Sequence, residues 1–384
     1  MKILLASSEM LDKDCPSNES VRIMNLEKGL RENENTVETC FYKTPEDLFS
    51  KLKSKIIKNE SFEKNVLQIK NSFKKVDVQG YEVINPHDVV CAGGFSGNMI
   101  LSVSGYFSRE VIAQSNADKK KKLELYDAAM SVEKSAIMKS KAIIACSRKL
   151  KGYISGVFKY PEEKIYVVGN SVDSDMFSPA EKDKVNSIRD EFSFDKQKFM
   201  VLIPRIKKVP DNIDKLCRII DSQKINDAFY VFCGWEDLKS TIEEKILNKN
   251  RCYFVGESLI EQQADLYRAS DFVLDTSVYS DIAEINDGQV PPAALKALSS
   301  GVVYVCLKND TYEENFVDGQ NMIMLKDFEK EVFELVYQKL TTAGNFMEDI
   351  GRNARKLVLS DEKDYSHYTN AKKYGKIFEY AITL

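Results

Sequence analysis

Short apolar segments alternate with amphipathic segments along the whole chain, and this alternation limits the fold more than any other feature. Five segments have the character of buried strands in the first half, at residues 2–6, 36–41, 88–91, 101–103 and 142–146. Five more follow in the second half, at residues 199–203, 228–232, 251–255, 272–275 and 302–307. Helical spacing of apolar residues predicts helices over residues 20–32, 123–139, 212–220, 262–269 and 292–299. Strands separated by helices are typical of βαβ units, so the sequence predicts an α/β protein with parallel sheets.

The length of the chain and the repeat of this pattern predict two doubly wound domains. A chain of 384 residues is too long for one core of ordinary size. Gly169, Asn170 and Pro179 cluster between the two sets of strands and predict a hinge over residues 168–179. Ligands of doubly wound sheets bind beyond the carboxyl ends of the strands, so we expect the site in a cleft between the domains.

Composition argues against several classes of protein. No apolar run reaches the roughly 18 residues that cross a bilayer, and the first apolar run is too short for a signal peptide, which predicts a cytoplasmic protein. The eight cysteines are scattered singly, as reduced core cysteines are. Only two histidines occur, far apart in sequence, so we expect no metal site. A net charge of −4 gives no electrostatic basis for binding nucleic acid.

Four segments, taken in order, resemble the family-4-type glycosyltransferases. They are residues 145–179 with A-C-S … V-V-G-N-S-V-D … F-S-P, residues 253–271 with Y-F-V-G … A-D-L-Y-R-A-S-D, residues 287–301 with D-G-Q-V-P-P … A-L-S-S-G, and residues 316–321 with F-V-D-G-Q-N. The first half is similar mainly in layout, through residues 16–30 and the stretch from Ser104 to Glu110, which resembles the family's H-G-x-x-x-E.

The resemblance implies the GT-B arrangement, in which two Rossmann-like domains face a cleft. Residues 1–173 would form the acceptor-side domain and residues 174–358 the domain that binds a nucleotide sugar. Residues 359–384 would form a helix that packs back on the first domain, and Tyr374, Ile377, Phe378 and Ala381 give this tail an amphipathic pattern. The nucleotide sugar would be a substrate, so no cofactor is expected.

Three basic residues follow the first strand of the second half, where the family holds the donor diphosphate. Arg205, Lys207 and Lys208 would neutralise charge on the leaving group. The family places its lysine at the position of Pro210, so Lys207 or Lys208 would have to substitute. An ordinary solvated basic turn is the alternative.

The donor loop of the family corresponds to Asp287, Gly288, Gln289 and Val290. The resemblance implies that its acid contacts sugar hydroxyls and that a later glutamate binds the ribose. Lys296 stands at the glutamate position, and a lysine cannot accept hydrogen bonds from ribose hydroxyls. Lys296 therefore indicates either an unusual donor or a lost activity.

Further cleft residues lie in loops after predicted strands. In the second half these are Gly256 and Ser258, expected near the nucleotide base, and Tyr279. In the first half they are Asn18, Ser20, Arg22, Ser104 and Gly105. The family commonly has a histidine where Ser104 stands, so no catalytic residue can be assigned. His87 is interpreted as a surface turn residue and His367 as structural.

Two functions from different classes fit these observations. The first is a glycosyltransferase, of hexosyltransferase type and retaining, that acts on a glycan, lipid-linked or protein acceptor. The second is a non-catalytic partner or chaperone of another glycosyltransferase, favoured by Lys296 and Ser104. Residues 119–122 are all lysine and would either contact the anionic inner face of a membrane or form a solvated helix face. Nucleotide-sugar epimerases need acid–base residues that the pattern does not supply.

Overall fold

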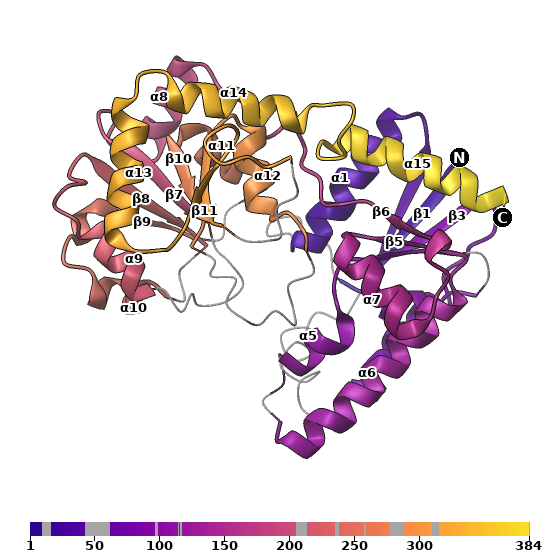
Figure 1. Ribbon diagram of the computed structural model, residues 1–384. Coiled ribbons are helices and arrows are strands. Elements are labelled where there is room, and N and C mark those ends of the chain that lie inside the picture. Colours follow the sequence, from indigo (N-terminus) through magenta and orange to yellow (C-terminus); the bar gives the residue numbers. More distant parts are fainter. Residues whose placement is uncertain are drawn as a thin grey trace.

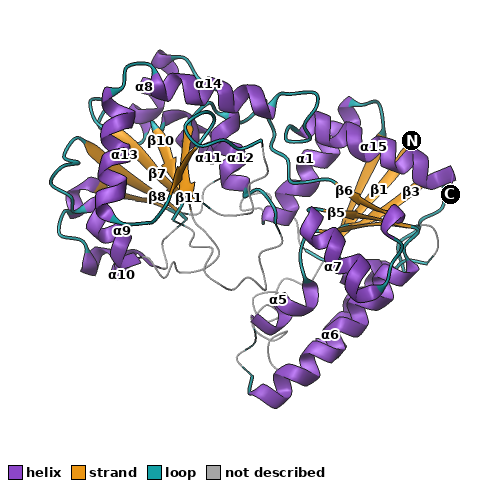
Figure 2. Cartoon of the chain, in the orientation of Figure 1, coloured by secondary structure: helices purple, strands orange, loops and turns teal. Residues whose placement is uncertain are grey.

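Two α/β domains lie side by side, each built on parallel strands with helices packed against them (Figure 1, Figure 2). The computed structural model describes residues 1–9, 17–42, 62–96, 99–113, 115, 117–204, 213–234, 238–256, 259–276, 288–308 and 315–383. The predicted α/β architecture with parallel strands is confirmed by the strand pairing.

Among its described residues, the first domain contains six parallel strands in two sets of three. They are β1 (Lys2–Ser7), β2 (Thr36–Phe41), β3 (Val83–Pro86), β4 (Ile100–Val103), β5 (Ala142–Ala145) and β6 (Ile165–Val167). The sets run β2-β1-β3 and β4-β5-β6, and a parallel bridge between Ile84 and Met99 joins them. The helices of this domain are α1 (Asn18–Glu32), α3 (Phe62–Phe73), α4 (Val89–Ala92), α5 (Phe107–Ala113), α6 (Lys119–Lys139) and α7 (Arg148–Phe158).

In the described part of the second domain, six strands form a parallel sheet in the order β12-β11-β10-β7-β8-β9. Its strands are β7 (Phe199–Pro204), β8 (Ala228–Cys233), β9 (Cys252–Val255), β10 (Phe272–Leu274), β11 (Val303–Leu307) and β12 (Ile323–Leu325). Its helices are α8 (Lys182–Glu191), α9 (Ile213–Ile220), α10 (Lys239–Lys245), α11 (Ile260–Ala269), α12 (Pro292–Ser299), α13 (Lys330–Thr342) and α14 (Phe346–Val358).

Both faces of each sheet are buried, which explains why the strands read as unbroken apolar runs. In β7, Met200 and Leu202 belong to one hydrophobic cluster, whereas Val201 and Ile203 belong to the other. Because successive side chains of a strand point to opposite faces, these are the two sides of one sheet. Burial on both sides of each sheet favours helix layers above and below it.

One predicted strand is wrong. Residues 88–91 were expected to be extended, but the strand is β3, and it ends before Asp88. The Asp88 side chain accepts a hydrogen bond of 2.7 Å from the backbone N–H of Cys91 and so caps α4. Aspartate satisfies the free N–H groups of a helix start, and this preference outweighs the apolar character of Val89 and Val90.

The last helix, α15 (His367–Thr383), returns to the first domain, as predicted (Figure 1). Its buried residues Tyr374 and Phe378 share a hydrophobic cluster with Ile23 and Leu26 of α1. The chain therefore crosses between the domains twice, first after β6 and again after α14. The crossings run side by side, because the backbone of Val172 pairs with the segment that precedes α15.

Helix α6 projects from the first domain and begins with the four lysines (Figure 1). Asp118 caps it by accepting a hydrogen bond of 3.0 Å from the backbone N–H of Lys121. Within the described ranges, no helix is both long enough and apolar enough to cross a membrane.

Candidate active site at the domain junction

Polar residues follow the strands at the point where each sheet reverses its strand order. In the first domain this point lies between β1 and β3, which are followed by Ser8 and His87. In the second domain it lies between β7 and β10, and the buried residues Asp275 and Thr276 follow β10. Ligands of doubly wound folds bind at this point, so these strand ends define the candidate site.

The first turn of α1 lies against the end of β3. Ser17 caps α1 by accepting a hydrogen bond of 3.1 Å from the backbone N–H of Ser20. Residues three apart share one face of a helix, and Glu19 and Arg22 form an ion pair of 3.5 Å there. Of the other residues expected in this loop, Asn18 begins α1 and Ser20 is fully buried.

His87 is buried, which corrects its interpretation as a surface turn residue. None of its surface is exposed, and its ring stacks on Tyr374 of α15 with the centroids 6.5 Å apart. Its Nδ1 atom lies 3.5 Å from Oε1 of Glu19 and 3.5 Å from Nη2 of Arg22. His87 thus lies between α1 and α15 in a group that we call the Glu19–Arg22–His87 cluster.

Burial and neighbouring charge fix the protonation of this cluster. Burial raises the pKa of Glu19, but the Arg22 guanidinium, with smaller contributions from His87 and the Ser104 hydroxyl, lowers it to about 2. Burial and Arg22 lower the pKa of His87, and Glu19 opposes them in part. At neutral pH the cluster therefore holds a carboxylate, a guanidinium and a neutral imidazole.

The segment that contains Gln289 and Val290 contacts the first domain beside this cluster. Gln289 donates a hydrogen bond from Nε2 to the backbone carbonyl of Ser104. Asn170, in the first crossing, donates a hydrogen bond of 3.1 Å to the carbonyl of Val290. The structure thus brings together Ser104 and Gln289, which the sequence analysis placed in one site from different halves of the chain.

Two predicted glycines lie close to side chains of the first domain at the same junction. Gly288 has a φ of +78°, and a Cβ there would lie 3.1 Å from Cδ of Lys149 and 3.4 Å from Oγ of Ser147. A Cβ on Gly105 would collide with the carboxylate of Glu110. A larger residue at either position would displace the groups that flank the Gln289–Ser104 contact.

Lys296 is held within the second domain. Its Nζ atom donates a hydrogen bond of 2.8 Å to Oε1 of Gln263 on α11 and lies 5.2 Å from the centroid of the Phe177 ring. Burial lowers the pKa of Lys296 to about 8. An amide oxygen and an aromatic face therefore surround the ammonium group.

The remaining predicted site residues divide into two groups. Gly256 follows β9, at the edge of the second sheet. The others lie outside the described residues, so their roles stay predictions; they are Arg205, Lys207, Lys208, Ser258, Tyr279 and Asp287.

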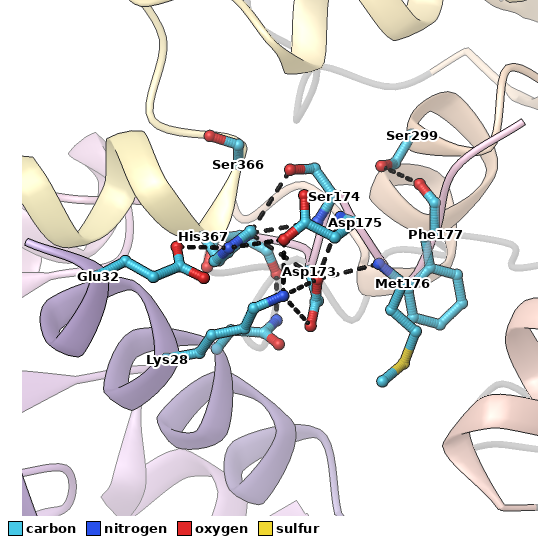
Figure 3. Close-up of polar contacts among 12 residues, drawn as sticks. Lys28, Glu32, Asp173, Ser174, Asp175, Met176, Phe177, Ser299, Ser366 and His367 are labelled. Carbon is cyan, nitrogen blue, oxygen red and sulfur yellow. Dashed lines mark hydrogen bonds and ion pairs between the residues drawn. The ribbon is translucent and has the colours of Figure 1, made fainter.

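A second polar cluster joins α1 to both crossings (Figure 3). Nε2 of His367 is 3.0 Å from Oε2 of Glu32 and 3.5 Å from Oδ2 of Asp175. Nζ of Lys28 is 2.8 Å from Oδ1 of Asp173 and 2.8 Å from Oδ2 of Asp175. One atom from each of Glu32, Asp175 and His367 lies within 4.8 Å of the others, a spacing that would suit a metal ion.

The protonation of the imidazole argues against a metal ion in this second cluster. Nδ1 of His367 accepts a hydrogen bond of 3.2 Å from the backbone N–H of Ser174, so the proton of the neutral ring is on Nε2 and points to Glu32. A metal on Nε2 would require the proton on Nδ1, facing the N–H of Ser174. Lys28 already supplies a positive charge to both aspartates.

Sequence reasoning missed Glu19 and His87. The spacing of Glu19 and Arg22 within one helical turn was visible in the sequence and could have indicated an ion pair. No pattern joins His87 to Tyr374, because 287 residues separate them (374 − 87) and only the return of α15 brings them together.

Comparisons with known proteins address the second domain and the whole fold separately. The family model described as glycosyl transferases group 1 matches residues 183–357. An uncharacterised glycosyltransferase of Methanocaldococcus jannaschii is 24% identical over 195 residues, which is 46% of this chain and 47% of that protein. The match therefore spans about half the length of that relative.

Solved structures are similar over the whole chain. Sucrose-phosphate synthase from Thermosynechococcus elongatus has a TM-score of 0.73 at 14% identity, covering 100% of this chain and 99% of that one. A glycosyltransferase from Rickettsia africae has a TM-score of 0.68 at 14% identity, covering 99% and 98%. Anabaena HepE in complex with UDP-glucose has a TM-score of 0.67 at 14% identity, covering 100% of both chains. The fold is therefore that of the two-domain GT-B glycosyltransferases, and residues 183–357 match the family model of glycosyl transferases group 1.

Proposed function

We propose that this protein transfers a hexose from a nucleotide sugar to a glycan, lipid-linked or protein acceptor. The observation that carries the proposal is the contact between the donor loop and the first domain, in which Gln289 binds the Ser104 carbonyl beside Glu19. A sugar held by the group 1 domain would meet this junction, where backbone and carboxylate acceptors can orient its hydroxyls. HepE, which has the same fold, is known in complex with UDP-glucose.

We propose further that the transfer retains the anomeric configuration. An inverting transfer needs a base near the acceptor hydroxyl with a pKa close to the working pH. Glu19 has its pKa lowered to about 2 and is held by Arg22, so it is a weak base. His87 is fully buried. These properties favour a reaction in which the leaving phosphate assists.

A non-catalytic partner of another glycosyltransferase is the second candidate. It is favoured by Lys296, whose ammonium is bound to Gln263 and Phe177 in place of a ribose-binding carboxylate. A partner protein would keep the GT-B fold and lose its affinity for nucleotides.

Calorimetry with UDP, GDP, ADP and their hexose derivatives tests the proposal. We expect one nucleotide to bind and its sugar to be transferred or slowly hydrolysed. The double variant Arg205→Ala/Lys208→Ala removes two charge-assisted contacts and should weaken binding at least about tenfold. Absence of binding across the panel supports the partner protein. Unchanged affinity in the double variant contradicts the phosphate site.

Lys296→Glu separates the two candidates further. In an enzyme the carboxylate can accept hydrogen bonds from the ribose hydroxyls, each contributing about 1.5 to 3 kcal/mol, so affinity for the cognate nucleotide should hold or rise. If Lys296 binds a phosphate or an acidic sugar, affinity should collapse, most steeply at low salt. In a partner protein, nucleotide binding should be undetectable before and after the change.

A further inference from the structure

The first crossing is held from both domains at once. On the second-domain side, Arg355 of α14 donates hydrogen bonds from Nη1 to the carbonyls of Ser174 at 2.8 Å and Phe177 at 3.0 Å. On the first-domain side, Lys28 of α1 donates to both Asp173 and Asp175. A rotation of one domain against the other must strain one of these attachments.

The second crossing is attached to the same place. The backbone N–H of His367 donates a hydrogen bond of 2.8 Å to the carbonyl of Val172, so the second crossing is paired with the first. The His367 ring then extends this pairing, because Nδ1 accepts from the Ser174 N–H and Nε2 donates to Glu32 (Figure 3). Helix α1 thus holds the first crossing through Lys28 and the second through Glu32.

Lys28 is the cation of this cluster and pairs with both of its aspartates. Lys28 is about a third exposed and Asp173 is largely buried, at 35% and 11% of their side-chain surface. Burial alone would lower the pKa of Lys28, but Asp173 and Asp175 raise it. Oδ1 of Asp173 also accepts hydrogen bonds of 3.1 Å from the backbone N–H groups of Asp175 and Met176. Lys28 therefore neutralises a carboxylate that organises the turn of the crossing.

We propose that Lys28 and Glu32 form a latch that holds both crossings against α1 and sets the angle between the domains. The same helix carries Glu19 and Arg22 in its first turn, so the latch and the Glu19–Arg22–His87 cluster are the two ends of one rigid element. The latch does not depend on the proposed function, because it concerns the two crossings between the domains and requires no bound nucleotide.

Hydrogen exchange and small-angle X-ray scattering of Lys28→Met test the latch without any ligand. The amides of Ser174, Asp175 and Met176 are expected to exchange about tenfold faster, because a charge-assisted contact is lost beside them. The radius of gyration should rise by about 1 Å above the roughly 21 Å or more expected for a chain of this length. Lys28→Arg keeps the charge and should behave like the wild type.

Lys2→Met is the matched control, because it removes a 3.3 Å ion pair with Glu38 that lies within the first domain. Glu32→Gln removes the charge that faces Nε2 of His367 and should likewise speed exchange over residues 172–177, and Glu27→Gln, which loses a 2.9 Å pair with Arg31 inside α1, is its control. Two results would overturn the latch. One is exchange over residues 172–177 that matches the Lys2→Met control. The other is faster exchange throughout the chain, which would show a general loss of stability instead.

Discussion

Partly buried charge defines the chemistry of two residues, Lys296 in the second domain and Glu19 in the first. Lys296 is a cation with no carboxylate partner among the described residues, held by Gln263 and an aromatic ring. Glu19 is an anion paired with Arg22. The pKa of each residue is lowered, but in a different pH range, so each residue has its own pH signature.

Lys296→Met should change how stability depends on alkaline pH. The pKa of Lys296 falls from 10.5 to about 8 on burial, so between these values the unfolded chain binds more protons than the folded one. The free energy of unfolding of the wild type should therefore rise relative to the variant from about pH 8 to pH 10.5. Urea unfolding of both proteins at four pH values measures this difference in the free energy of unfolding. Lys339→Met, which removes an exposed ammonium over Phe346, is the control. If the free energies of unfolding of the wild type and of Lys296→Met changed in parallel with pH, the burial of the Lys296 charge would be contradicted.

Glu19→Gln should lower stability most at neutral pH. Removing one partner of a buried pair leaves Arg22 uncompensated, and such losses cost about 3 kcal/mol. The folded-state pKa is lowered from 4.5 to about 2, so the contribution of Glu19 is complete above pH 4.5 and is lost as the pH falls through 2. The difference in the free energy of unfolding between the wild type and Glu19→Gln should therefore be smaller at pH 3.5 than at pH 7, by about 1 kcal/mol. A constant difference would show that Glu19 does not ionise as described.

At the scale of elements, α1 and α15 pack closely enough to require glycine at one position. A Cβ on Gly29 would collide with the carbonyl of His367 and would lie 2.7 Å from Cβ of Ala371. Gly29→Ala should lower the free energy of unfolding by about 2 kcal/mol, because rigid backbone cannot move aside. Gly375→Ala, where nothing lies within 4 Å, should raise it by about 0.5 to 1 kcal/mol. Thermal unfolding of both variants measures these changes. Equal changes in the free energy of unfolding for the two variants would contradict the close packing of α1 against α15.

Elements with strong local signals were predictable from the sequence. The helix expected over residues 292–299 is α12, since Pro292 fits a first turn and apolar residues recur at helical spacing. The strand expected over residues 36–41 is β2. Apolar composition alone wrongly predicted a strand over residues 88–91, where Asp88 caps the helix α4. Composition does not show that the free backbone N–H groups of a helix start need an acceptor.

Contacts between remote elements were not predictable in the same way. The family resemblance placed Ser104 and Gln289 in one site, and the structure joins them directly. Nothing local indicates that Lys296 would meet Gln263, which lies on a different helix, or that Lys28 would meet Asp173. These pairs form because the strand order and the return of α15 bring their elements together, which is a property of topology.

At the scale of the molecule, the two domains contribute unlike parts to one site. The second domain carries the group 1 region, and the first supplies Ser104 and the Glu19–Arg22–His87 cluster. If the proposed function is right, a nucleotide and a nucleotide sugar should protect different surfaces. The nucleotide should be recognised by the second domain alone, whereas the sugar should reach the junction.

Hydrogen exchange of the full chain with the cognate nucleotide and with its sugar derivative tests this division. The nucleotide should slow exchange within residues 199–308. The nucleotide sugar should also slow it around Ser104 and in the first turn of α1, because a ligand that binds the folded state suppresses local opening at its contacts. Gln289→Ala removes the link across the junction and should abolish the added protection while leaving nucleotide affinity within about twofold. Protection confined to the second domain with both ligands would mean that the sugar does not reach the first domain, and the junction would then have only a structural role.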